Sequence, residues 1–365
     1  MNQKIVLVKR PAGEVRPSDF QLVETAVPDL KEGEVLFKTK YFSLDPYMRG
    51  RMNEYKSYAE PFQLGEVVKG AAICIVEASK NPDFKVGDIV LAKSGWQKYA
   101  VYNPQITKKL PEVINAVLKL PPDIKHSLFL GILGMPGLAA FHGLYDIGQP
   151  KAGETVVVAA ATGPVGSMVG QLAKAKGCHV VGIAGGSEKC RYAVEKLGFD
   201  VCIDHTSKSF PKELANACPK GCDIYFELVG GTVFNTVFPL LNLHARVPVC
   251  GGAAWYNSAA TLREKRISLR NLFSKISAFL HMFFHLDRTP LIFLTTMVRR
   301  IKFQGFIIQD HYDDYERFIK EALPLVQSGK IKYKEDIVQG IENAPDTFIK
   351  LIKGRNFGKT IIEII

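Results

Sequence analysis

Short runs of apolar residues, separated by glycine, proline and aspartate, fill the first third of the chain. Some runs alternate polar and apolar positions, as half-buried strands do, and others are continuous, as buried strands are. The predicted strands cover residues 20–24, 35–39, 71–76 and 88–92. Short strands with this punctuation predict a small β-barrel or sandwich.

The pattern changes after Pro121 and Pro122, where helical stretches alternate with compact apolar runs. The expected strands cover residues 154–160, 179–184, 201–204, 222–227 and 245–250, and the expected helices cover 167–176 and 188–197. Strand, helix and strand at this spacing predict a parallel sheet covered by helices. Residues 337–365 return to short strands and a helix, and we expect them to fold back onto the first domain.

Composition excludes several classes of protein. A chain of 365 residues, 47% hydrophobic and 23% charged, has ordinary globular composition and room for about two domains. The net charge of +11 favours anionic partners without choosing among them. Seven cysteines without a CxxC pair indicate reduced thiols, and neither a signal peptide nor a membrane-spanning run is present in the sequence. The expected compartment is the cytoplasm.

A glycine-containing turn is the strongest local signal. Residues 161–166 read Ala-Thr-Gly-Pro-Val-Gly and lie between an expected strand and an expected helix. Such a turn brings backbone N–H groups and a helix amino terminus to a pyrophosphate. It departs from the full dinucleotide fingerprint because Ala161 occupies the first glycine position. The alternative is a turn that needs glycine for packing alone.

The end of the second strand distinguishes between the two nicotinamide cofactors. An NAD site usually has an acid there, which binds the ribose 2′-hydroxyl. The chain instead continues through Gly185 and Gly186 to Ser187, Glu188 and Lys189. Ser187 can donate a hydrogen bond and Lys189 offers positive charge to a 2′-phosphate, so NADP(H) is predicted. The alternative for Lys189 is a solvated helix lysine.

Six stretches of the sequence, in order along the chain, carry a family resemblance. They are residues 43–49 (Ser-Leu-Asp-Pro-Tyr-Met-Arg), 133–138, 160–166, 250–252 with Tyr256 and Asn257, 304–308 and 356–360. With them the chain resembles the zinc-independent branch of the medium-chain dehydrogenase/reductases. The likeness is to the group of prostaglandin/leukotriene reductases, curcumin reductases and other NADPH-dependent 2-alkenal reductases.

The resemblance implies an α/β architecture with a GroES-like β-barrel catalytic domain and a doubly wound Rossmann domain. Residues 1–126 would form the catalytic domain, 127–309 the NADP-binding domain, and 310–365 the return to the catalytic domain. The active site would lie in the cleft between them, and the family forms homodimers. No metal is expected, because this chain has Gly65-Glu66 where the zinc alcohol dehydrogenases have Gly-His-Glu.

The resemblance also assigns cofactor contacts position by position. Gly163, Pro164, Val165 and Gly166 would hold the pyrophosphate. Lys189 with Ser187, and His205 where the family usually has tyrosine, would bind the 2′-phosphate. The nicotinamide side and the returning tail would be formed by Cys250, Gly251, Gly252, Tyr256, Phe306, Ile307, Ile308 and Asn356. The chain departs from the family at Ala139, Ala140 and Phe141, which replace Thr-Ala-Tyr near the nicotinamide, and at Leu228, which replaces asparagine.

Two tyrosines are the candidate catalytic residues. Hydride transfer to the β-carbon of an enal or enone places negative charge on the carbonyl oxygen, which needs a hydrogen-bond donor. Tyr47 and Tyr256 could donate to this oxygen or supply the proton to the α-carbon. Backbone amides, the ribose hydroxyl or water could serve instead. Tyr47 could also simply pack the domain junction, and Tyr256 could contact the ribose.

The segment 258–302 departs from the family and has an unusual composition. Nine lysines and arginines against two acids place seven of the eleven net positive charges here. Apolar residues recur at helical spacing between Leu272 and Phe283, and a second apolar run follows Pro290. Such a segment is typical of an interfacial membrane helix, so residues 262–302 are a candidate peripheral membrane contact. A helix that covers the cleft or a dimer interface is the alternative.

Three functions are compatible with the sequence. The favoured one is an NADPH-dependent reductase of the activated C=C bond of α,β-unsaturated aldehydes and ketones. The second is an NADPH quinone reductase of the same superfamily, and the third a non-catalytic membrane-associated NADPH-binding protein. Nucleic-acid binding is disfavoured because the basic residues interleave with an apolar stripe.

Overall fold

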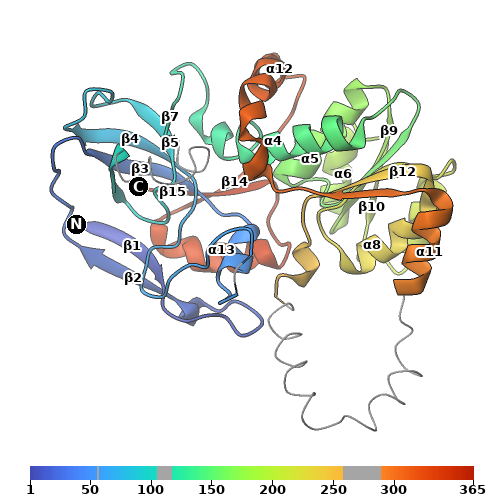
Figure 1. The fold of residues 1–365 in the computed structure, drawn as a ribbon, viewed down its shortest axis with the longest axis horizontal. Coiled ribbons are helices and arrows are strands. Elements are labelled where there is room, and N and C mark those ends of the chain that lie inside the picture. The colour runs from blue at the N-terminus through green and yellow to red at the C-terminus, as the bar shows by residue number, and fades with distance from the viewer. Residues whose placement is uncertain (56, 105–116, 258–288) are drawn as a thin grey trace, which may run out of the picture.

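The computed structural model describes residues 1–55, 57–104, 117–257 and 289–365, and these form two lobes (Figure 1). The first lobe holds a seven-stranded mixed sheet with the strand order β14-β15-β3-β4-β5-β7, in which β6 also pairs with β3. A two-stranded antiparallel sheet of β1 and β2 lies beside it. The strands of this lobe are β1 (Asn2–Leu7), β2 (Phe20–Thr25), β3 (Val35–Ser43), β4 (Ala72–Ser79), β5 (Ile89–Ala92), β6 (Tyr99–Tyr102), β7 (Leu118–Lys119), β14 (Glu335–Gln339) and β15 (Lys359–Glu363).

An aromatic cluster fills the first lobe. Trp96 is fully buried and stacks with Phe20 and Phe42 at ring distances of 5.8 and 5.9 Å. Phe348 of the helix α13 (Ala344–Ile352) completes the cluster edge-on, with its ring 5.6 Å from Trp96. The carboxyl-terminal part of the chain therefore supplies both strand β15, which pairs antiparallel with β3, and part of this core.

The second lobe is built on six parallel strands in the order β10-β9-β8-β11-β12-β13. Its strands are β8 (Thr155–Val158), β9 (His179–Ala184), β10 (Val201–Asp204), β11 (Cys222–Phe226), β12 (Leu241–Val249) and β13 (Lys302–Gly305). Its helices are α4 (Met135–His142), α5 (Pro164–Ala175), α6 (Ser187–Glu195), α7 (Phe210–Ala217), α8 (Gly231–Val237), α11 (Thr289–Arg299) and α12 (Tyr315–Gln327). This is the predicted covered parallel sheet, and the α/β fold class is confirmed.

Two hydrophobic cores cover the two faces of the parallel sheet. Helices α4, α5 and α12 share one core with Val156 and Phe226, while α7 and α8 pack with Val157 and Tyr225 on the other face. The alternation of Val156 and Val157 between the faces is the period of two that a strand imposes. Because α12 lies in the core of the second lobe, the chain returns to the first lobe only after this helix (Figure 1).

Short helical turns connect the larger elements. They are α1 (Tyr47–Arg51), η1 (Pro17–Asp19), η2 (His126–Leu130), the π-helical turn η3 (Gly143–Gly148), η4 (Phe238–Leu240), η5 (Ala253–Trp255), η6 (Ile308–Asp314) and η7 (Ile341–Asn343). Three of them carry candidate site residues: α1 carries Tyr47, η5 precedes Tyr256, and η6 begins at Ile308. None of the helices in the described residues is both long enough and apolar enough to span a membrane.

Candidate active site

The glycine turn packs helix α5 directly against the end of strand β8. Gly163 caps the helix, and its N–H donates to the carbonyl of Ala160 at 2.9 Å. A Cβ on Gly166 would lie 2.4 Å from that same carbonyl oxygen, so only glycine allows the helix to start so close to the strand. The first-turn N–H groups of a helix have no intrahelical acceptors, which makes this end suited to an anion.

Ser187 and His205 follow the ends of two neighbouring strands, β9 and β10. Ser187 begins α6 directly after Gly186, whose φ of 90° fits glycine. The backbone N–H of His205 donates to Ala184 at the end of β9, at 3.0 Å. A Cβ on Gly185 would lie 3.1 Å from Nε2 of His205, so the imidazole lies beside the glycine pair. These residues form one polar edge next to the glycine turn.

Lys189 is held by the returning tail of the chain. Its ammonium group donates to the carbonyl of Gly354 at 2.8 Å, and the lysine is half-buried. Burial lowers the pKa of Lys189, while Asp336 and Glu188 oppose that shift. Asn356 follows two residues after Gly354, and its amide donates to Gly358 at 2.9 Å. The structure therefore brings Lys189 and Asn356 to the same edge, and Lys189 is not a freely solvated lysine.

The residues predicted for the nicotinamide side follow β12 and β13. The N–H groups of Cys250 and Gly251 donate to the carbonyl of Glu227 at 3.0 and 3.2 Å, and the hydroxyl of Tyr256 lies near Gly251. The N–H of Phe306 donates to Val249 at 3.4 Å. These residues and their neighbours Gly252, Ile307 and Ile308 lie at the carboxyl ends of parallel strands. That edge of the sheet also carries the glycine turn, where ligands bind in open α/β sheets.

Glu227 organises the turn after β11 and was not predicted. It is 3% exposed, and its carboxylate accepts hydrogen bonds from the N–H groups of Val229 and Gly230 at 2.6 and 2.8 Å. The hydroxyl of Tyr225 donates to its second oxygen at 2.9 Å. Burial raises the pKa of Glu227, and these hydrogen bonds oppose that rise. The sequence did offer a signal for Glu227: it is an acid that comes directly after a buried strand and shortly before two glycines.

Both predicted catalytic tyrosines lie where the two lobes meet. Burial raises the pKa of Tyr47, and Asp45, Tyr58 and Tyr312 act on it electrostatically. Tyr58 is 48% exposed, and its pKa is raised to about 12 by partial burial first and then by Tyr256. Tyr312 has its pKa raised to about 12 by burial and then by Asp45. Four phenols therefore share one region, and the sequence indicated two of them.

A buried ion pair fixes the strand segment beside these tyrosines. Nζ of Lys359 lies 2.5 Å from Oδ1 of Asp45, with both side chains less than a tenth exposed. The ammonium also donates to the hydroxyl of Ser43 at 2.6 Å and to the carbonyl of Leu44 at 3.0 Å, and Ser43 donates to Asp45. All donors of Lys359 are thus satisfied, which is the condition under which a buried charge is tolerated. The ion pair joins residues 43–49 to residues 356–360, which are two of the six stretches that carry the family resemblance.

Arg49 connects the two lobes. The side chain is fully buried and donates to Oδ1 of Asn257 at 3.2 Å, to Oδ1 of Asn53 at 2.8 Å and to the carbonyl of Gly13 at 2.7 Å. Asn257 follows Tyr256, so this contact ties the tyrosine segment of the second lobe to the α1 helix of the first. Burial lowers the pKa of Arg49. The atoms that accept hydrogen bonds from its guanidinium are neutral amide and carbonyl oxygens.

The departures from the family pattern lie in different surroundings. Ala139, Ala140 and Phe141 are at most 4% exposed, and Phe141 packs edge-on against Phe318 of α12 at 5.6 Å. The missing hydroxyls therefore belong to positions in the hydrophobic core. Leu228 is partly buried, and its carbonyl accepts the N–H of Ala253 at 3.2 Å.

Most of the basic amphipathic segment lies outside the described residues, which resume at position 289. The apolar run after Pro290 forms α11, and it is largely exposed. The exposed side chains on this helix are Leu291, Phe293, Leu294, Met297 and Val298. Arg299, at the end of the helix, donates to the carbonyls of Pro239 and Leu241 at 2.9 and 2.5 Å.

Glu66 follows Gly65 directly, in the stretch where this chain lacks the histidine of the Gly-His-Glu motif. Its carboxylate is exposed and lies 3.4 Å from the ammonium of Lys69. Within the described ranges, one group of three His, Cys, Asp or Glu side chains has the spacing of metal ligands. It consists of His142, His311 and Asp314.

Comparison with known proteins assigns the family. Residues 3–110 match the model of the N-terminal domain of oxidoreductases, and residues 164–286 match the model of zinc-binding dehydrogenases. The fold and site thus define a two-domain dehydrogenase/reductase of the medium-chain type. The chain belongs to the zinc-independent NADPH-dependent reductase group of this family, as the relatives below show.

The similar proteins match over the whole chain. The NADPH-dependent curcumin reductase of Escherichia coli K12 is 48% identical over 364 residues, covering 100% of this chain and 97% of that protein. Prostaglandin reductase 1 of Bos taurus is 37% identical, with 98% and 97% covered. The crystal structure of CurA from Vibrio vulnificus in complex with NADPH is 46% identical, with a TM-score of 0.87 and 100% and 99% covered.

Proposed function

We propose that the protein reduces the activated C=C bond of α,β-unsaturated aldehydes and ketones with NADPH as the reductant. The relatives named for curcumin, prostaglandin and 2-alkenal reduction support this reaction class. The observation that carries the proposal is the group of four phenols at the junction of the lobes, beside the edge that suits a dinucleotide.

The residues present fit NADP(H). Gly166 lets α5 begin close to the end of β8, and the N–H groups at the amino terminus of α5 would bind the diphosphate. Lys189, Ser187 and His205 would hold the 2′-phosphate, and Asn356 would bind from the tail. A 2′-phosphate would replace the Gly354 carbonyl as the partner of the Lys189 ammonium. Cys250 to Gly252, Tyr256 and Phe306 to Ile308 would line the nicotinamide side.

The reduced nicotinamide supplies the hydride for the β-carbon of the substrate. The chain must stabilise the charge that then develops on the carbonyl oxygen and must allow the α-carbon to be protonated. A tyrosine hydroxyl is a protonated donor at neutral pH, and burial raises the pKa of Tyr47, Tyr256 and Tyr312 further above its ordinary value. Tyr47 and Tyr256 are our candidates for these two tasks.

A steady-state assay tests the reaction class. We expect purified protein to oxidise NADPH in the presence of 2-alkenals or 15-keto lipids, with little activity on quinones, and to prefer NADPH over NADH. Oxidation that requires a quinone would replace the proposal with quinone reduction. Binding of NADPH without turnover on any of these substrates would contradict both reductase functions.

Tyrosine variants test the catalytic assignment. Tyr47→Phe and Tyr256→Phe each keep the aromatic packing and remove the hydroxyl, so we expect kcat to fall by about 10²-fold or more in the double variant. Tyr315→Phe is a matched control, because that hydroxyl donates to the carbonyl of Leu133 instead of facing the junction. An unchanged kcat in the double variant would dismiss both tyrosines and leave Tyr58 and Tyr312 to be tested.

Three further predictions concern the surroundings of the enzyme. The family resemblance implies the homodimer, and the sequence pattern indicates the cytoplasmic location and the peripheral membrane contact of residues 262–302; we propose all three on that basis. The exposed apolar side chains of α11 are compatible with either a dimer or a membrane contact. Liposome co-sedimentation of the full chain and of a variant with polar substitutions on α11 distinguishes the two: equal pelleting removes the membrane contact.

A further inference from the structure

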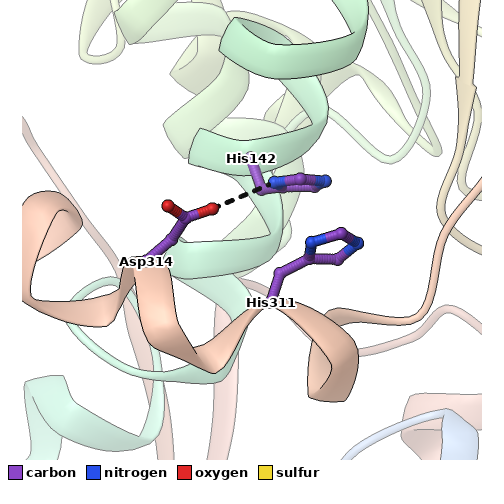
Figure 2. A group of neighbouring side chains, drawn as sticks. All are labelled: His142, His311 and Asp314. Carbon is purple, nitrogen blue, oxygen red and sulfur yellow. Dashed lines mark ion pairs between the residues drawn. The ribbon is translucent and has the colours of Figure 1, made fainter.

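Two histidine–aspartate pairs face each other between α4 and η6. His142 ends α4, and Asp146 follows four residues later in η3, while His311 and Asp314 lie three residues apart in η6. Figure 2 shows His142, His311 and Asp314 grouped between the two elements, with the two imidazole rings one above the other. The ring centroids are 3.7 Å apart. None of these residues belongs to the proposed cofactor or catalytic residues.

The buried nitrogen of His142 faces two carboxylates. His142 is 6% exposed, and its Nδ1 makes no hydrogen bond within the described part of the chain. The carboxylate of Asp146 lies 3.0 Å from this nitrogen without hydrogen-bond geometry, and that of Asp314 lies 3.5 Å away.

The spacing of these groups fits ligands of one metal ion. A nitrogen and an oxygen bound to the same tetrahedral zinc are about 3.3 Å apart, given metal–ligand distances of about 2.0 and 2.1 Å. The Nδ1 of His142 and the carboxylate oxygen of Asp314 are 3.5 Å apart, and ligand atoms of all three residues lie within 4.8 Å of one another. The pair of His142 and Asp314 already has this spacing, and the His311 nitrogen is the ligand that must move to complete the set.

The charges around the group also favour a cation. Arg317 donates to Asp146 at 2.6 Å and lies 3.6 Å from Oδ1 of Asp314, which leaves Oδ2 of Asp314 facing His142. Such outer contacts commonly orient a metal-binding carboxylate. Two carboxylates against one guanidinium leave the group with net negative charge when the imidazoles are neutral.

We propose that His142, His311 and Asp314 bind one Zn²⁺ ion, with water in the fourth position. Two imidazoles and a carboxylate are a ligand set that zinc accepts and that magnesium disfavours. The His311 ring must turn from its stacked position to aim a nitrogen at the ion. His311 is half-buried, so its ring is not enclosed on every side.

The site differs in place and role from an alcohol dehydrogenase zinc. It would join η6 to the end of α4, away from Glu66, and a bound ion would hold η6 in position. Tyr312 follows His311 directly, so the ion would also fix the backbone that presents one of the junction phenols. We therefore assign the ion a stabilising role, with no part in polarising the substrate.

Zinc titration of the metal-free full chain tests the site. Isothermal titration calorimetry with Zn²⁺ would compare the wild type with His311→Gln and Asp314→Asn, which change partly exposed side chains and should fold. His244→Asn is the matched control, because it removes an exposed imidazole on strand β12 that is not one of the proposed ligands. Other histidines and cysteines of the chain can bind zinc, so the comparison between variants is the readout.

We expect the wild type and His244→Asn to bind one more equivalent of Zn²⁺ than the two site variants, or to bind it at least tenfold more tightly. Zn²⁺ should raise the Tm of the wild type and leave the Tm of the site variants unchanged, while Mg²⁺ should do neither. Tetrahedral Co²⁺ absorption in the wild type and its loss in His311→Gln would support the same ligands. Equal stoichiometry, affinity and Tm shift in all four proteins would overturn the proposal.

Discussion

The glycine turn and the tyrosine junction are two parts of one candidate site, built in opposite ways. The turn comes from one continuous stretch, in which the ends of β8 and α5 meet around Gly166. The junction comes from segments far apart in the sequence: Asp45 contacts Lys359, 314 positions away, and Arg49 contacts Asn257, 208 positions away. The turn depends on backbone geometry, and the junction depends on buried charge.

This difference determines how each part responds to change. In the turn the requirement is steric, because a methyl group added at Gly166 would clash with the carbonyl of Ala160, which the strand holds in place. In the junction the requirement is electrostatic, because a buried ion that loses its partner is not solvated by water in the partner's place. We therefore expect junction substitutions to affect the stability of the whole fold and turn substitutions to affect cofactor binding first.

The largest effect should follow loss of the Asp45 carboxylate. Asp45→Ala would leave the ammonium of Lys359 buried without an anion, and breaking such a pair costs about 3–5 kcal/mol of unfolding free energy. Urea unfolding followed by tryptophan fluorescence measures the loss, since Trp96 lies in the core of the same lobe.

Two variants control this measurement. Glu32→Ala removes an exposed ion pair with Lys80 and should cost less than about 0.5 kcal/mol. The double variant Asp45→Leu with Lys359→Met removes both charges and should recover part of the loss. If Asp45→Ala were no less stable than Glu32→Ala, the buried pair would not hold the junction together.

Gly166→Ala should have the second largest effect. The added Cβ would lie 2.4 Å from the Ala160 carbonyl oxygen, so α5 must shift, at a cost of about 1–3 kcal/mol. The shift moves the helix amino terminus, and we expect the Kd for NADPH to rise at least tenfold. Fluorescence titration with NADPH measures it. Gly50→Ala is the control, because a Cβ there meets nothing within 4 Å; equal affinity in both variants would contradict the role of the turn.

The regular elements of the second lobe could be predicted because their signals are local. Strands expected at residues 179–184 and 201–204 are β9 and β10, and the expected helix after the glycine turn is α5, which begins at Pro164 instead of residue 167. The earlier start follows from proline, which suits the first position of a helix. Apolar periodicity alone does not predict that the helix begins at this proline.

The junction could be predicted only in part. Tyr47 stood out through its neighbours in sequence, but Tyr58 and Tyr312 carried no local pattern that separates them from ordinary surface tyrosines. Likewise, Lys359 and Asp45 each resemble a surface charge until the sheet places β15 beside β3. The polar and apolar pattern of a strand does not predict which residues of a distant strand lie opposite it, so contacts that depend on this register cannot be predicted from either strand alone.

Lys189→Ala should have an intermediate effect, confined to cofactor choice. Losing a charge-assisted hydrogen bond to the 2′-phosphate would cost about 1.5–3 kcal/mol, so kcat/KM for NADPH should fall about 10- to 100-fold. The value for NADH should change little, because NADH lacks that phosphate. Lys174→Ala, which loses a surface pair with Asp200, is the control. An equal loss with both cofactors would show that the Lys189 contact with the tail matters more than the phosphate.

The smallest effect should come from Glu227→Gln. This residue combines features of both regions, because it is a buried carboxylate, as in the junction, and it orders backbone geometry, as in the turn. The amide oxygen can still accept from Val229 and Gly230, so the cost at pH 5 should be about 1 kcal/mol. Burial raises the pKa of Glu227 above its ordinary value. The folded state therefore binds a proton more tightly than the unfolded state, and its contribution to stability is present at low pH and is lost as pH rises through the folded pKa.

The sign of that shift gives the test. Measured by urea unfolding from pH 4.5 upward, the wild type should lose stability relative to Glu227→Gln until the carboxyl is ionised in the folded state, and the difference should then stay constant. Glutamine does not titrate, so the variant isolates this group from the other acids. A difference that moves the other way with pH would mean that the hydrogen bonds from Val229, Gly230 and Tyr225 outweigh burial and lower the pKa. In that case Glu227 would resemble Asp45, as a charge that the fold stabilises in its ionised form.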